Sequence, residues 1–580
     1  MNRFARRGLL GAIAAAVAGM PLLYLGRSEI RAFAFLVIVG LVYAACIPPT
    51  RGAYVDNAMA GASLGISLWG MTNVILLLFS SSRHLAFDAA GMQTHFASLV
   101  GWVIFGAVFG VVLQLAGDVA AVRFGPEVMP APQPPTIHSR IVILGGGFAG
   151  MKTAECLEKT LDGQGTVSIS LVSETNALLF TPMLAEVAGS SLEPSQISAP
   201  LRSTLRRTSF VRAQVTGIDF ARRVVLLDGG RIHDADHTHE LAYDHLVLAL
   251  GSVSNYLGLH NVEKMAFDFK TLLDAVRIRN HVIEMFERAD RELDPSIRRR
   301  LLTFVIAGGG FAGVELAGAL NDFAHGISPD YRNVAIEELC VTLVHSRDRI
   351  LPELSETLGV YALEKMKQRG VTFRLGARLI DAQPGLVTLS DGQIPTETLV
   401  WTAGTAPSPL IKSLGLPTNA RGAILVDRTL AVPDHPGIWA LGDCAAVTDG
   451  KTGMPCPPTA QFALREAATI AKNITATLAG APPDPFHFNS LGALCVIGHQ
   501  TACAELTIPF APSRSLRFSG LLAWLMWRGI YLSKLPGLER KIRVLMSWTL
   551  ELFFPRDIIQ TIELGRKDTH VNDTAPGASH

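Results

Sequence analysis

The same six residues, GGGFAG, occur twice in this chain, at Gly145–Gly150 and again at Gly308–Gly313. Each copy follows a short apolar run (Arg140–Leu144 and Leu301–Ala307) and precedes a stretch of helical character. A glycine-rich turn between a buried strand and a helix lets the backbone approach a pyrophosphate, which the unpaired N–H groups of the helix N-terminus can bind. Two copies in register predict two Rossmann-like nucleotide-binding domains in an α/β chain, and two sites imply electron transfer between two cofactors.

Each glycine of the motif has its own role. The first allows a tight turn, the second lets the backbone approach the pyrophosphate, and the third packs the helix on the strand. We therefore expect six glycines to bind cofactors: Gly145, Gly147 and Gly150 in the first copy, and Gly308, Gly310 and Gly313 in the second.

Apolar residues are concentrated in the first 120 residues, in a chain that is 49% hydrophobic and only 17% charged. About 20 apolar residues in a helix span the hydrocarbon core of a bilayer. We expect residues 1–123 to form four transmembrane helices, from four windows without Asp, Glu, Lys or Arg: Gly8–Gly26, Ala32–Thr50, Asn57–Ser82 and Ala89–Gly117.

The positions of basic residues predict the orientation of these helices. Arg3, Arg6 and Arg7 precede the first window, which favours a cytoplasmic N-terminus. An even number of crossings then leaves the catalytic domains facing the cytoplasm from the inner (cytoplasmic) membrane. A cleaved signal peptide is the alternative for the first window, but further apolar windows follow it. A Pro-rich linker at 124–139 separates this segment from the soluble part.

Charge and cysteine content exclude several classes of function. Lys plus Arg (51) nearly balances Asp plus Glu (50), so no overall charge favours nucleic acid. The seven cysteines are scattered, without a CxxC pair or metal-ligand spacing. We therefore expect reduced thiols, no metal site and no disulfide-reductase chemistry.

Three further segments extend the pattern: "LVLALGS" (Leu246–Ser252), "LVWTAGT" (Leu399–Thr405) and "GIWALGDCA" (Gly437–Ala445). With both glycine motifs, they make the chain resemble the two-dinucleotide flavoprotein reductases. The resemblance implies that Gly442 and Asp443 bind the ribityl–phosphate part of FAD. We also expect Glu174, at the end of the strand "VSISLVSETN", to contact ribose, and Gly251 and Gly404 to lie at the cofactors.

A closer resemblance lies in "LLFTPMLAEVAGSSLEPSQISAPLR" (Leu178–Arg202), "GGGFAGVELAGAL" (Gly308–Leu320) and "PPTAQFALREAATIAKNI" (Pro457–Ile474). The segment "LAWLMWRGIYLSKLPGLERKIRVLMSW" (Leu522–Trp548) extends it. From about Arg140 to Leu564 the chain resembles type II NADH dehydrogenases, the non-pumping NADH:quinone oxidoreductases. The likeness implies FAD, NADH or NADPH, and a membrane quinone.

Residue roles follow from this resemblance. Gln461, with Ala460, matches the pair beside the flavin on the quinone side, where an amide can bind a quinone carbonyl. Glu315 matches the glutamate near nicotinamide and flavin, where a carboxylate can deliver protons. Phe180 and Pro182 match the segment along the isoalloxazine.

The chain also departs from the family pattern. Family members commonly have an acid where Ser173 stands and many have a lysine where Leu491 stands. After the second motif, the strand "CVTLV" (Cys340–Val344) leads to His345, where a strict NADH enzyme has an acid that repels a 2′-phosphate. We therefore expect NADPH to be used at a rate comparable to NADH.

The expected layout is an FAD domain split around an NAD(P)H domain. FAD-binding parts at 140–270 and 401–485 flank the NAD(P)H domain at 271–400, followed by a membrane-interface and quinone-access region at 486–567 and a tail at 568–580. Within that region, Leu535–Leu564 has the basic residues and aromatics of an amphipathic helix in the bilayer surface, or of a helix packed on the protein's own core. We also expect a homodimer.

Two other functions stay open. The fold could serve as a membrane-anchored redox sensor or docking module, with the helices as the effector. It could also be another pyridine nucleotide-dependent reductase, such as a sulfide:quinone-type enzyme, although that branch depends on paired reactive cysteines.

Overall fold

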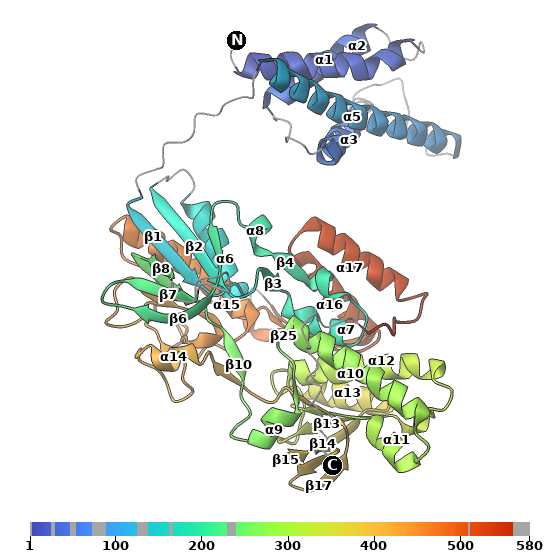
Figure 1. The fold of residues 1–580 in the computed structure, drawn as a ribbon, viewed down its shortest axis with the longest axis vertical. Coiled ribbons are helices and arrows are strands. Elements are labelled where there is room, and N and C mark those ends of the chain that lie inside the picture. Colours follow the sequence, from blue (N-terminus) through green and yellow to red (C-terminus); the bar gives the residue numbers. More distant parts are fainter. Residues whose placement is uncertain are drawn as a thin grey trace, which may run out of the picture. The chain divides into compact units, whose positions relative to one another are not determined.

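The computed structural model describes residues 3–24, 30–46, 54–71, 89–124, 137–161, 166–228, 239–508 and 511–560. The chain divides into two compact units, Met1–Pro134 and Pro135–His580 (Figure 1).

The N-terminal unit is helical. It contains α1 (Arg3–Tyr24), α2 (Ile30–Cys46), α3 (Tyr54–Gly70) and α5 (Ala89–Phe124), with α1 packed on α2 and α3 packed on α5. The second pair approaches backbone to backbone, because a Cβ atom on Gly61 would lie 2.0 Å from the carbonyl oxygen of Gly106. Small residues permit such close packing of apolar helices.

Helix length and composition support one candidate membrane span among the described residues. Ser98–Ala120, within α5, is long and apolar enough to cross a bilayer, while Leu9–Met20 and Phe33–Ala44 are apolar but shorter. The third expected window, Asn57–Ser82, lies partly outside the described residues. The structure therefore does not show the four crossings expected from the sequence, and that topology stays a prediction.

A five-stranded parallel sheet follows the first glycine motif. Its order is β21-β9-β1-β2-β5, and it combines strands from two distant stretches of sequence. The helices α6 (Phe148–Thr160) and α15 (Ala460–Leu478) pack against each other beside this sheet (Figure 1). The strands are β1 (Ser139–Leu144), β2 (Val167–Ser173), β5 (Ser209–Arg212), β9 (His245–Leu248) and β21 (Ile438–Ala440).

A second five-stranded parallel sheet follows the second glycine motif, with the order β11-β18-β12-β13-β14. All its strands lie in the sequence between β9 and β21 of the first sheet, and the nearby helices include α10 (Leu272–Arg291), α12 (Phe311–Ile327) and α13 (Glu356–Gln368). The predicted α/β class with parallel sheets is confirmed. The strands are β11 (Phe267–Asp268), β12 (Thr303–Ala307), β13 (Cys340–His345), β14 (Thr372–Leu375) and β18 (Thr398–Trp401).

Smaller elements form short helices and sheets that are separate from the two five-stranded sheets. They include two antiparallel three-stranded sheets and the short pairs β3–β4 and β10–β19. Their bounds are β3 (Ala177–Leu179), α7 (Leu184–Ala188), β4 (Ser198–Pro200), α8 (Leu201–Thr204), β6 (Gln214–Asp219), β7 (Val224–Asp228), β8 (His239–Ala242), β10 (Ser252–Ser254), α9 (His260–Met265), α11 (Pro295–Leu301), β15 (Leu379–Gln383), β16 (Leu386–Leu389), β17 (Gly392–Pro395), β19 (Thr405–Pro407), α14 (Leu410–Ser413), β20 (Ile424–Leu425) and β22 (Ala445–Ala446).

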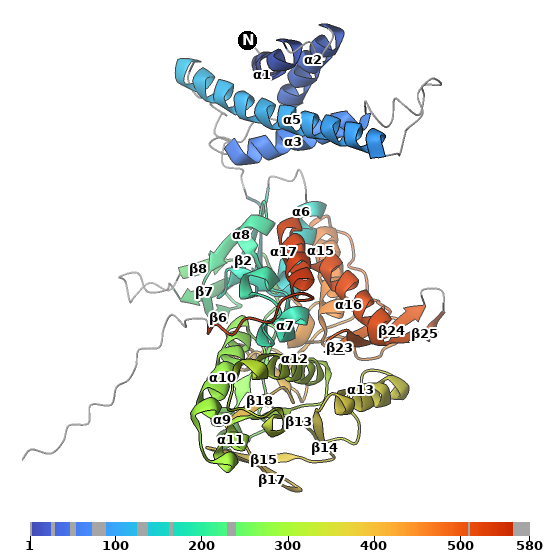
Figure 2. The ribbon, with the colours of Figure 1, turned by 90° about the vertical axis from the view of Figure 1, so that its right-hand side faces the viewer.

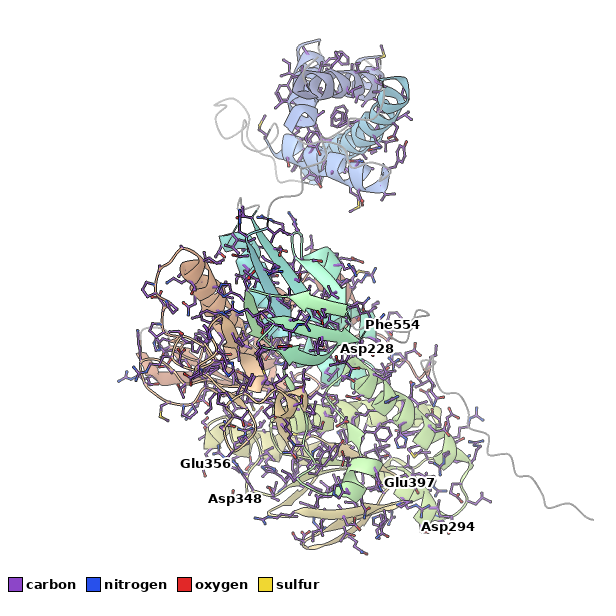
Figure 3. The ribbon with its side chains drawn as sticks, turned by 60° about the vertical axis from the view of Figure 1, so that its left-hand side comes forward. Asp228, Asp294, Asp348, Glu356, Glu397 and Phe554 are labelled. Carbon is purple, nitrogen blue, oxygen red and sulfur yellow. The ribbon has the colours of Figure 1, made fainter. Side chains whose placement is uncertain are left out.

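The C-terminal part contains a sheet that the sequence did not predict. The antiparallel strands β23 (Gly492–Gly498), β24 (Thr501–Ile508) and β25 (Ala511–Ser519) pack against α12 and α16 (Gly520–Lys534), as Figure 2 shows. The last helix, α17 (Leu538–Leu550), buries Val544 and Trp548. Beyond it the chain is not helical up to residue 560, and the exposed Phe554 projects from the surface (Figure 3).

Candidate functional site

The first glycine motif forms a tight turn between β1 and α6. Gly145 has φ +112°, and a Cβ atom there would lie 2.1 Å from the carbonyl oxygen of Ala249. A Cβ on Gly150 would lie 1.9 Å from the carbonyl oxygen of Gly145. Gly147 is the N-cap of α6 without a side-chain cap, and no atom lies within 4 Å of where its Cβ would be. The helix N-terminus therefore faces open space that fits a pyrophosphate.

The second motif repeats this geometry between β12 and α12. Gly308 has φ +128°, and a Cβ on Gly313 would lie 1.9 Å from the carbonyl oxygen of Gly308. Gly310 is the N-cap of α12, again without a side-chain cap. One difference is that the Oε1 atom of Glu353 lies 3.3 Å from the Cβ position of Gly310, so an acid lies over this turn.

The residues at the ends of β2 and β13 differ more from each other than the two glycine turns do. Glu174, after β2, is exposed, and its carbonyl oxygen accepts from Arg212 Nε at 3.2 Å. His345, at the end of β13, accepts the N–H of Gly309 on Nδ1 at 3.1 Å. Its Nε2 atom is buried without a hydrogen-bond partner among the described residues. Burial and the charge of Arg347 lower the pKa of His345, so the ring is neutral at pH 7.

Asp443 lies in the turn after β21, at the open edge of the first sheet. Its Oδ2 atom accepts from Ser252 Oγ at 2.6 Å, and Ser252 Oγ in turn accepts from Lys270 Nζ at 2.6 Å. Lys270 Nζ also lies 4.0 Å from Asp443 Oδ2. Burial lowers the pKa of Lys270. Sequence reasoning missed Ser252 and Lys270, because Ser252 lies 191 residues from Asp443 in the sequence and Lys270 reaches it through Ser252.

The glycines near Asp443 also take positions that a larger residue would disturb. Gly442 has φ +69°, and its N–H donates to Glu466 on α15 at 2.7 Å. Burial raises the pKa of Glu466 to about 7. Gly251 has φ +65° with open space at its Cβ position, whereas a Cβ on Gly404 would lie 3.1 Å from the carbonyl oxygen of Asn255.

Gln461, the second residue of α15, has both ends of its amide engaged. Nε2 donates to the carbonyl oxygen of Gly492 at 3.2 Å, and Oε1 accepts from the backbone N–H of Leu491 at 2.9 Å and from Ser490 Oγ at 3.2 Å. The half-buried Ala460 precedes it. The amide thus ties α15 to the segment that leads into β23, and its contact with a quinone stays a prediction.

Glu315 lies one turn into α12, beside β23. It accepts the backbone N–H of Val496 at 3.3 Å, and desolvation raises the pKa of its carboxyl to about 8. At pH 7 the carboxyl is therefore mostly protonated. The proton-delivery role expected for Glu315 stays a prediction, and the sequence did not predict that burial would keep the carboxyl neutral.

Phe180 connects the first glycine motif to the C-terminal helices. Its ring is buried and lies edge-to-face with Phe148, at the start of α6, and with Tyr531, on α16, at centroid distances of 5.8 and 6.1 Å. Pro182 follows it and lines a pocket that Glu315 also lines.

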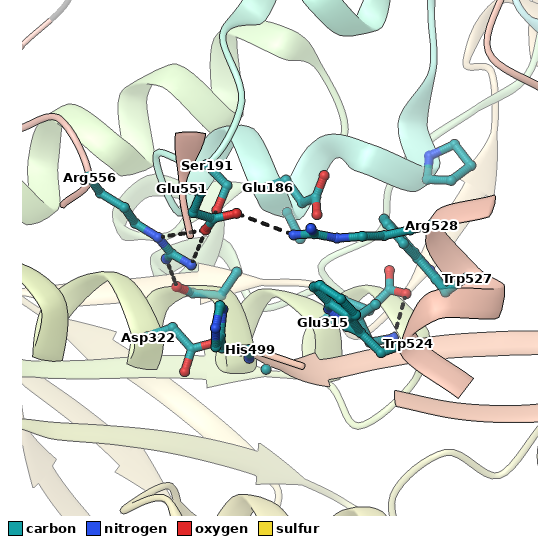
Figure 4. A pocket seen from close by; sticks show the side chains of 15 residues that line it. Glu186, Ser191, Glu315, Asp322, His499, Trp524, Trp527, Arg528, Glu551 and Arg556 are labelled. Atoms are coloured by element: carbon teal, nitrogen blue, oxygen red, sulfur yellow. Dashed lines mark hydrogen bonds and ion pairs between the residues drawn. The ribbon is translucent and has the colours of Figure 1, made fainter. Parts of the chain in front are cut away.

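This pocket lies between α7, α12, the end of β23 and α16 (Figure 4). Charged side chains line much of it, and most of them were not predicted as site residues. Gln461 is not among the lining residues. In the described part of the chain, no group of three or more His, Cys, Asp or Glu side chains is arranged to hold a metal ion. The charged lining residues are Glu186, Glu315, Asp322, Arg528, Glu551 and Arg556.

Comparison with known proteins identifies the family. The model for pyridine nucleotide-disulphide oxidoreductases matches residues 139–467, and the model for the NDH2 C-terminal domain matches residues 490–557. The type II NADH:quinone oxidoreductase Ndh of Mycobacterium tuberculosis is 32% identical over 447 residues, which are 74% of this chain and 91% of that protein. The chain belongs to the type II NADH:quinone oxidoreductase family.

Other relatives and structures agree with this family. An internal alternative NAD(P)H-ubiquinone oxidoreductase from mitochondria of Solanum tuberosum is 30% identical, over 72% of this chain and 87% of that protein. The structure of NDH2 from Plasmodium falciparum in complex with NADH has the same fold, with a TM-score of 0.66 and 18% identity over 73% of this chain and 99% of that chain. The resemblance drawn from the sequence motifs is confirmed. The ranges matched by the two family models, 139–467 and 490–557, both lie C-terminal to the N-terminal helical unit.

Proposed function

We propose that this protein is an FAD-dependent NADH:quinone oxidoreductase that does not pump protons. The observation that carries the proposal is the pair of uncapped, glycine-lined helix N-termini on two separate parallel sheets of one unit. Family membership supports the same reaction.

The first sheet is the proposed FAD site. Gly145, Gly147 and Gly150 give the pyrophosphate access to the N-terminus of α6, and Asp443 stands at the adjacent strand end with Ser252 and Lys270. Glu174 is exposed at the ribose position. FAD, when bound, supplies the two-electron carrier that no side chain of this chain provides.

The second sheet is the proposed nucleotide site, with Gly308, Gly310 and Gly313 at the N-terminus of α12 and His345 at the ribose. Glu315 also lies on α12, about one turn after the N-terminus of the helix. A protonated Glu315 can donate its proton to a quinone oxygen as the quinol forms, and so act as a general acid. Gln461 holds the Ser490–Gly492 segment near this end of α15.

A lipid bilayer is the proposed environment of both ends of the chain. In the N-terminal unit, apolar side chains such as Ile38, Met59, Ile104 and Val119 are each more than half exposed. Water would not favour so much apolar surface, whereas lipid does. We propose a multi-pass attachment to the inner membrane with the N-terminus and catalytic domains on the cytoplasmic side.

The C-terminal helices are the proposed route for quinone from the bilayer. Leu538, Ile542, Leu545 and Met546 on α17 are all at least half exposed, and Phe553 and Phe554 follow. Exposed apolar residues beside basic ones suit the membrane interface. The homodimer stays a prediction, which light scattering of the detergent-solubilised protein can test.

Turnover is the decisive experiment. We expect the purified protein to carry non-covalent FAD and to oxidise NADH repeatedly with a short-chain benzoquinone, measured at 340 nm. Reduction of one flavin per chain without further NADH consumption would instead favour the redox-sensor alternative. A sulfide:quinone activity is not favoured, because that branch depends on paired reactive cysteines, and burial raises the pKa values of the Cys444, Cys495 and Cys503 thiols.

A further inference from the structure

Glu186, on α7, has its carboxyl in the pocket wall and takes no part in the reaction proposed above. Its Oε2 atom accepts the indole N–H of Trp548 at 3.0 Å. The helix α7 packs against α12, which carries Glu315, and both carboxyls line the same pocket. In the view of Figure 4, the two lie on opposite sides of the Arg528 side chain.

The two arginines of the pocket, Arg528 and Arg556, both form ion pairs with a third acid, Glu551. Arg528 pairs with Glu551 at 3.2 Å, and Arg556 pairs with Glu551 at 2.8 Å. Ser191 Oγ also donates to Glu551 at 2.7 Å. Although burial opposes ionisation, Arg556, Ser191 and Arg528 together lower the pKa of Glu551. Glu551 is therefore the ionised partner of the two arginines.

Glu186 is left as an acid that can change its protonation state near neutral pH. Burial raises its pKa, and Glu551 adds to this, while Arg528, Trp548 and Arg556 oppose it, with a net value of about 7. Two tryptophan rings hold Arg528 in place. Its guanidinium carbon lies 3.8 Å from the ring centroid of Trp524 and 4.6 Å from that of Trp548.

Glu315 faces mainly neutral surroundings and the charge of Glu186. Burial is the main cause of its raised pKa, and the negative charge of Glu186 raises it further. The other titratable groups that interact with it are Cys495 on β23 and Tyr531 on α16, whose pKa values are themselves raised by burial. Both groups are neutral at pH 7, so Glu186 is the titrating neighbour of Glu315.

The proposed reaction requires one proton from solvent in each cycle. NADH delivers two electrons and one proton as hydride, whereas reduction of a quinone to a quinol consumes two electrons and two protons. The balance is NADH + H⁺ + quinone → NAD⁺ + quinol, and the additional proton has to reach a site from which water is excluded.

We propose, on the basis of the function proposed above, that Glu186 relays this proton from water in the pocket to Glu315. The O–H of Glu315 gives its proton to the quinone oxygen, and the resulting carboxylate is reprotonated from the O–H of Glu186 through water in the pocket that both side chains line. Water in the pocket then reprotonates Glu186. The ion pairs of Glu551 with Arg528 and Arg556 hold the relay in position without titrating.

The test uses the full-length, FAD-loaded protein with Glu186→Gln, which keeps the side-chain size and an oxygen that can accept from Trp548. Stopped-flow absorbance at 450 nm follows reduction by NADH and then reoxidation by a short-chain benzoquinone, between pH 6 and 9.5. We expect flavin reduction to be unchanged and reoxidation to slow by about tenfold or more, the scale of lost general acid catalysis. Formate or acetate, added as small carboxylic acids, should restore part of the rate.

The pH profile separates a relay from a structural role. Removing the negative charge of Glu186 lowers the pKa of Glu315, so the alkaline fall in reoxidation rate should move to lower pH in the variant. Glu364→Gln, an exposed carboxyl on α13, is the matched control and should leave the profile unchanged.

Three results would overturn the relay: an unchanged pH profile in Glu186→Gln, equal slowing of both half-reactions, or slowing that small acids do not relieve. In each case, quinone reduction by the unmodified protein would still show whether the proposed function itself holds. An unmodified protein that quinone does not reoxidise would refute the function instead.

Discussion

The two glycine motifs have the same sequence and nearly the same turn geometry, yet the residues around them differ. In both, the third glycine touches the carbonyl oxygen of the first at a distance that admits no Cβ atom. The first opens onto free space and an acid, Asp443, held by Ser252 and Lys270. The second lies under Glu353 and beside the neutral His345. We therefore propose that the shared turn binds a pyrophosphate at both sites, and that the residues around it decide which nucleotide is retained and which is exchanged.

The largest effect should come from a matched pair of substitutions in the two turns. Gly150→Ala and Gly313→Ala each place a methyl group 1.9 Å from a carbonyl oxygen. Overpacking of this kind costs roughly 1–3 kcal/mol, or about 5- to 150-fold in affinity. We expect Gly150→Ala to lose FAD on gel filtration, and Gly313→Ala to keep FAD while its KM for NADH rises. Equal loss of FAD in both variants would contradict the assignment of the two sites.

The next effect is expected at Asp443, the acid beside the first site. Asp443→Ala removes a charged contact worth roughly 1.5–3 kcal/mol, so FAD should be retained about 10- to 150-fold more weakly. Equilibrium dialysis with measurement of bound flavin at 450 nm checks this. Asp228→Ala, at an exposed acid labelled in Figure 3, is the control. Full flavin occupancy in Asp443→Ala at low FAD would remove Asp443 from the site.

The second site lacks an acid at position 345, and introducing one there should change the preference between NADH and NADPH. His345→Glu introduces a carboxylate that can accept the Gly309 N–H and repels a 2′-phosphate. We expect the kcat/KM ratio of NADH to NADPH to rise by about tenfold, the scale of one polar contact. Rejection of NADPH by several orders of magnitude in the unmodified enzyme would show that another residue reads the 2′ position.

The smallest effect concerns pH at the same histidine. Burial lowers the pKa of His345 below 6.5, so the ring gains its proton only as the pH falls below that value. The positive charge should then favour NADPH over NADH by about two- to fivefold between pH 7.5 and 5.5, as expected for a solvated ion pair. Glu or Gln at position 345 should abolish this dependence, and a ratio that stays constant in the unmodified enzyme would contradict it.

Much of the fold could be predicted because local patterns determine it. The apolar runs and glycines at 140–150 and 301–313 specify strand, turn and helix within a dozen residues, and both sheets follow from them. The sheet β23–β25 could also have been found. "GALCVIG" and "TACAELTI" flank the two-residue turn His499–Gln500, where Gln500 has φ +54°. That is the pattern of a β-hairpin.

The pocket could not be predicted, because its charges come from segments far apart in sequence. Ser191 and Glu551 are 360 residues apart, and Glu186 and Trp548 are 362 apart. Gln461 shows a related limit. Its helix position follows from the sequence, but its partners at Leu491 and Gly492 depend on how the next segment folds back. Single-sequence patterns do not encode such contacts.

The order of strands in the first sheet has a consequence for biosynthesis. Its edge strand β21 and the helix α15 lie about 190 residues or more after β9 in the chain. A ribosome releases the chain from its N-terminus, so the second sheet is completely synthesised while the first still lacks a strand and a covering helix. On the assignment proposed above, the FAD site is incomplete until residue 478 has emerged, and a chain stopped earlier should leave the ribosome without bound flavin.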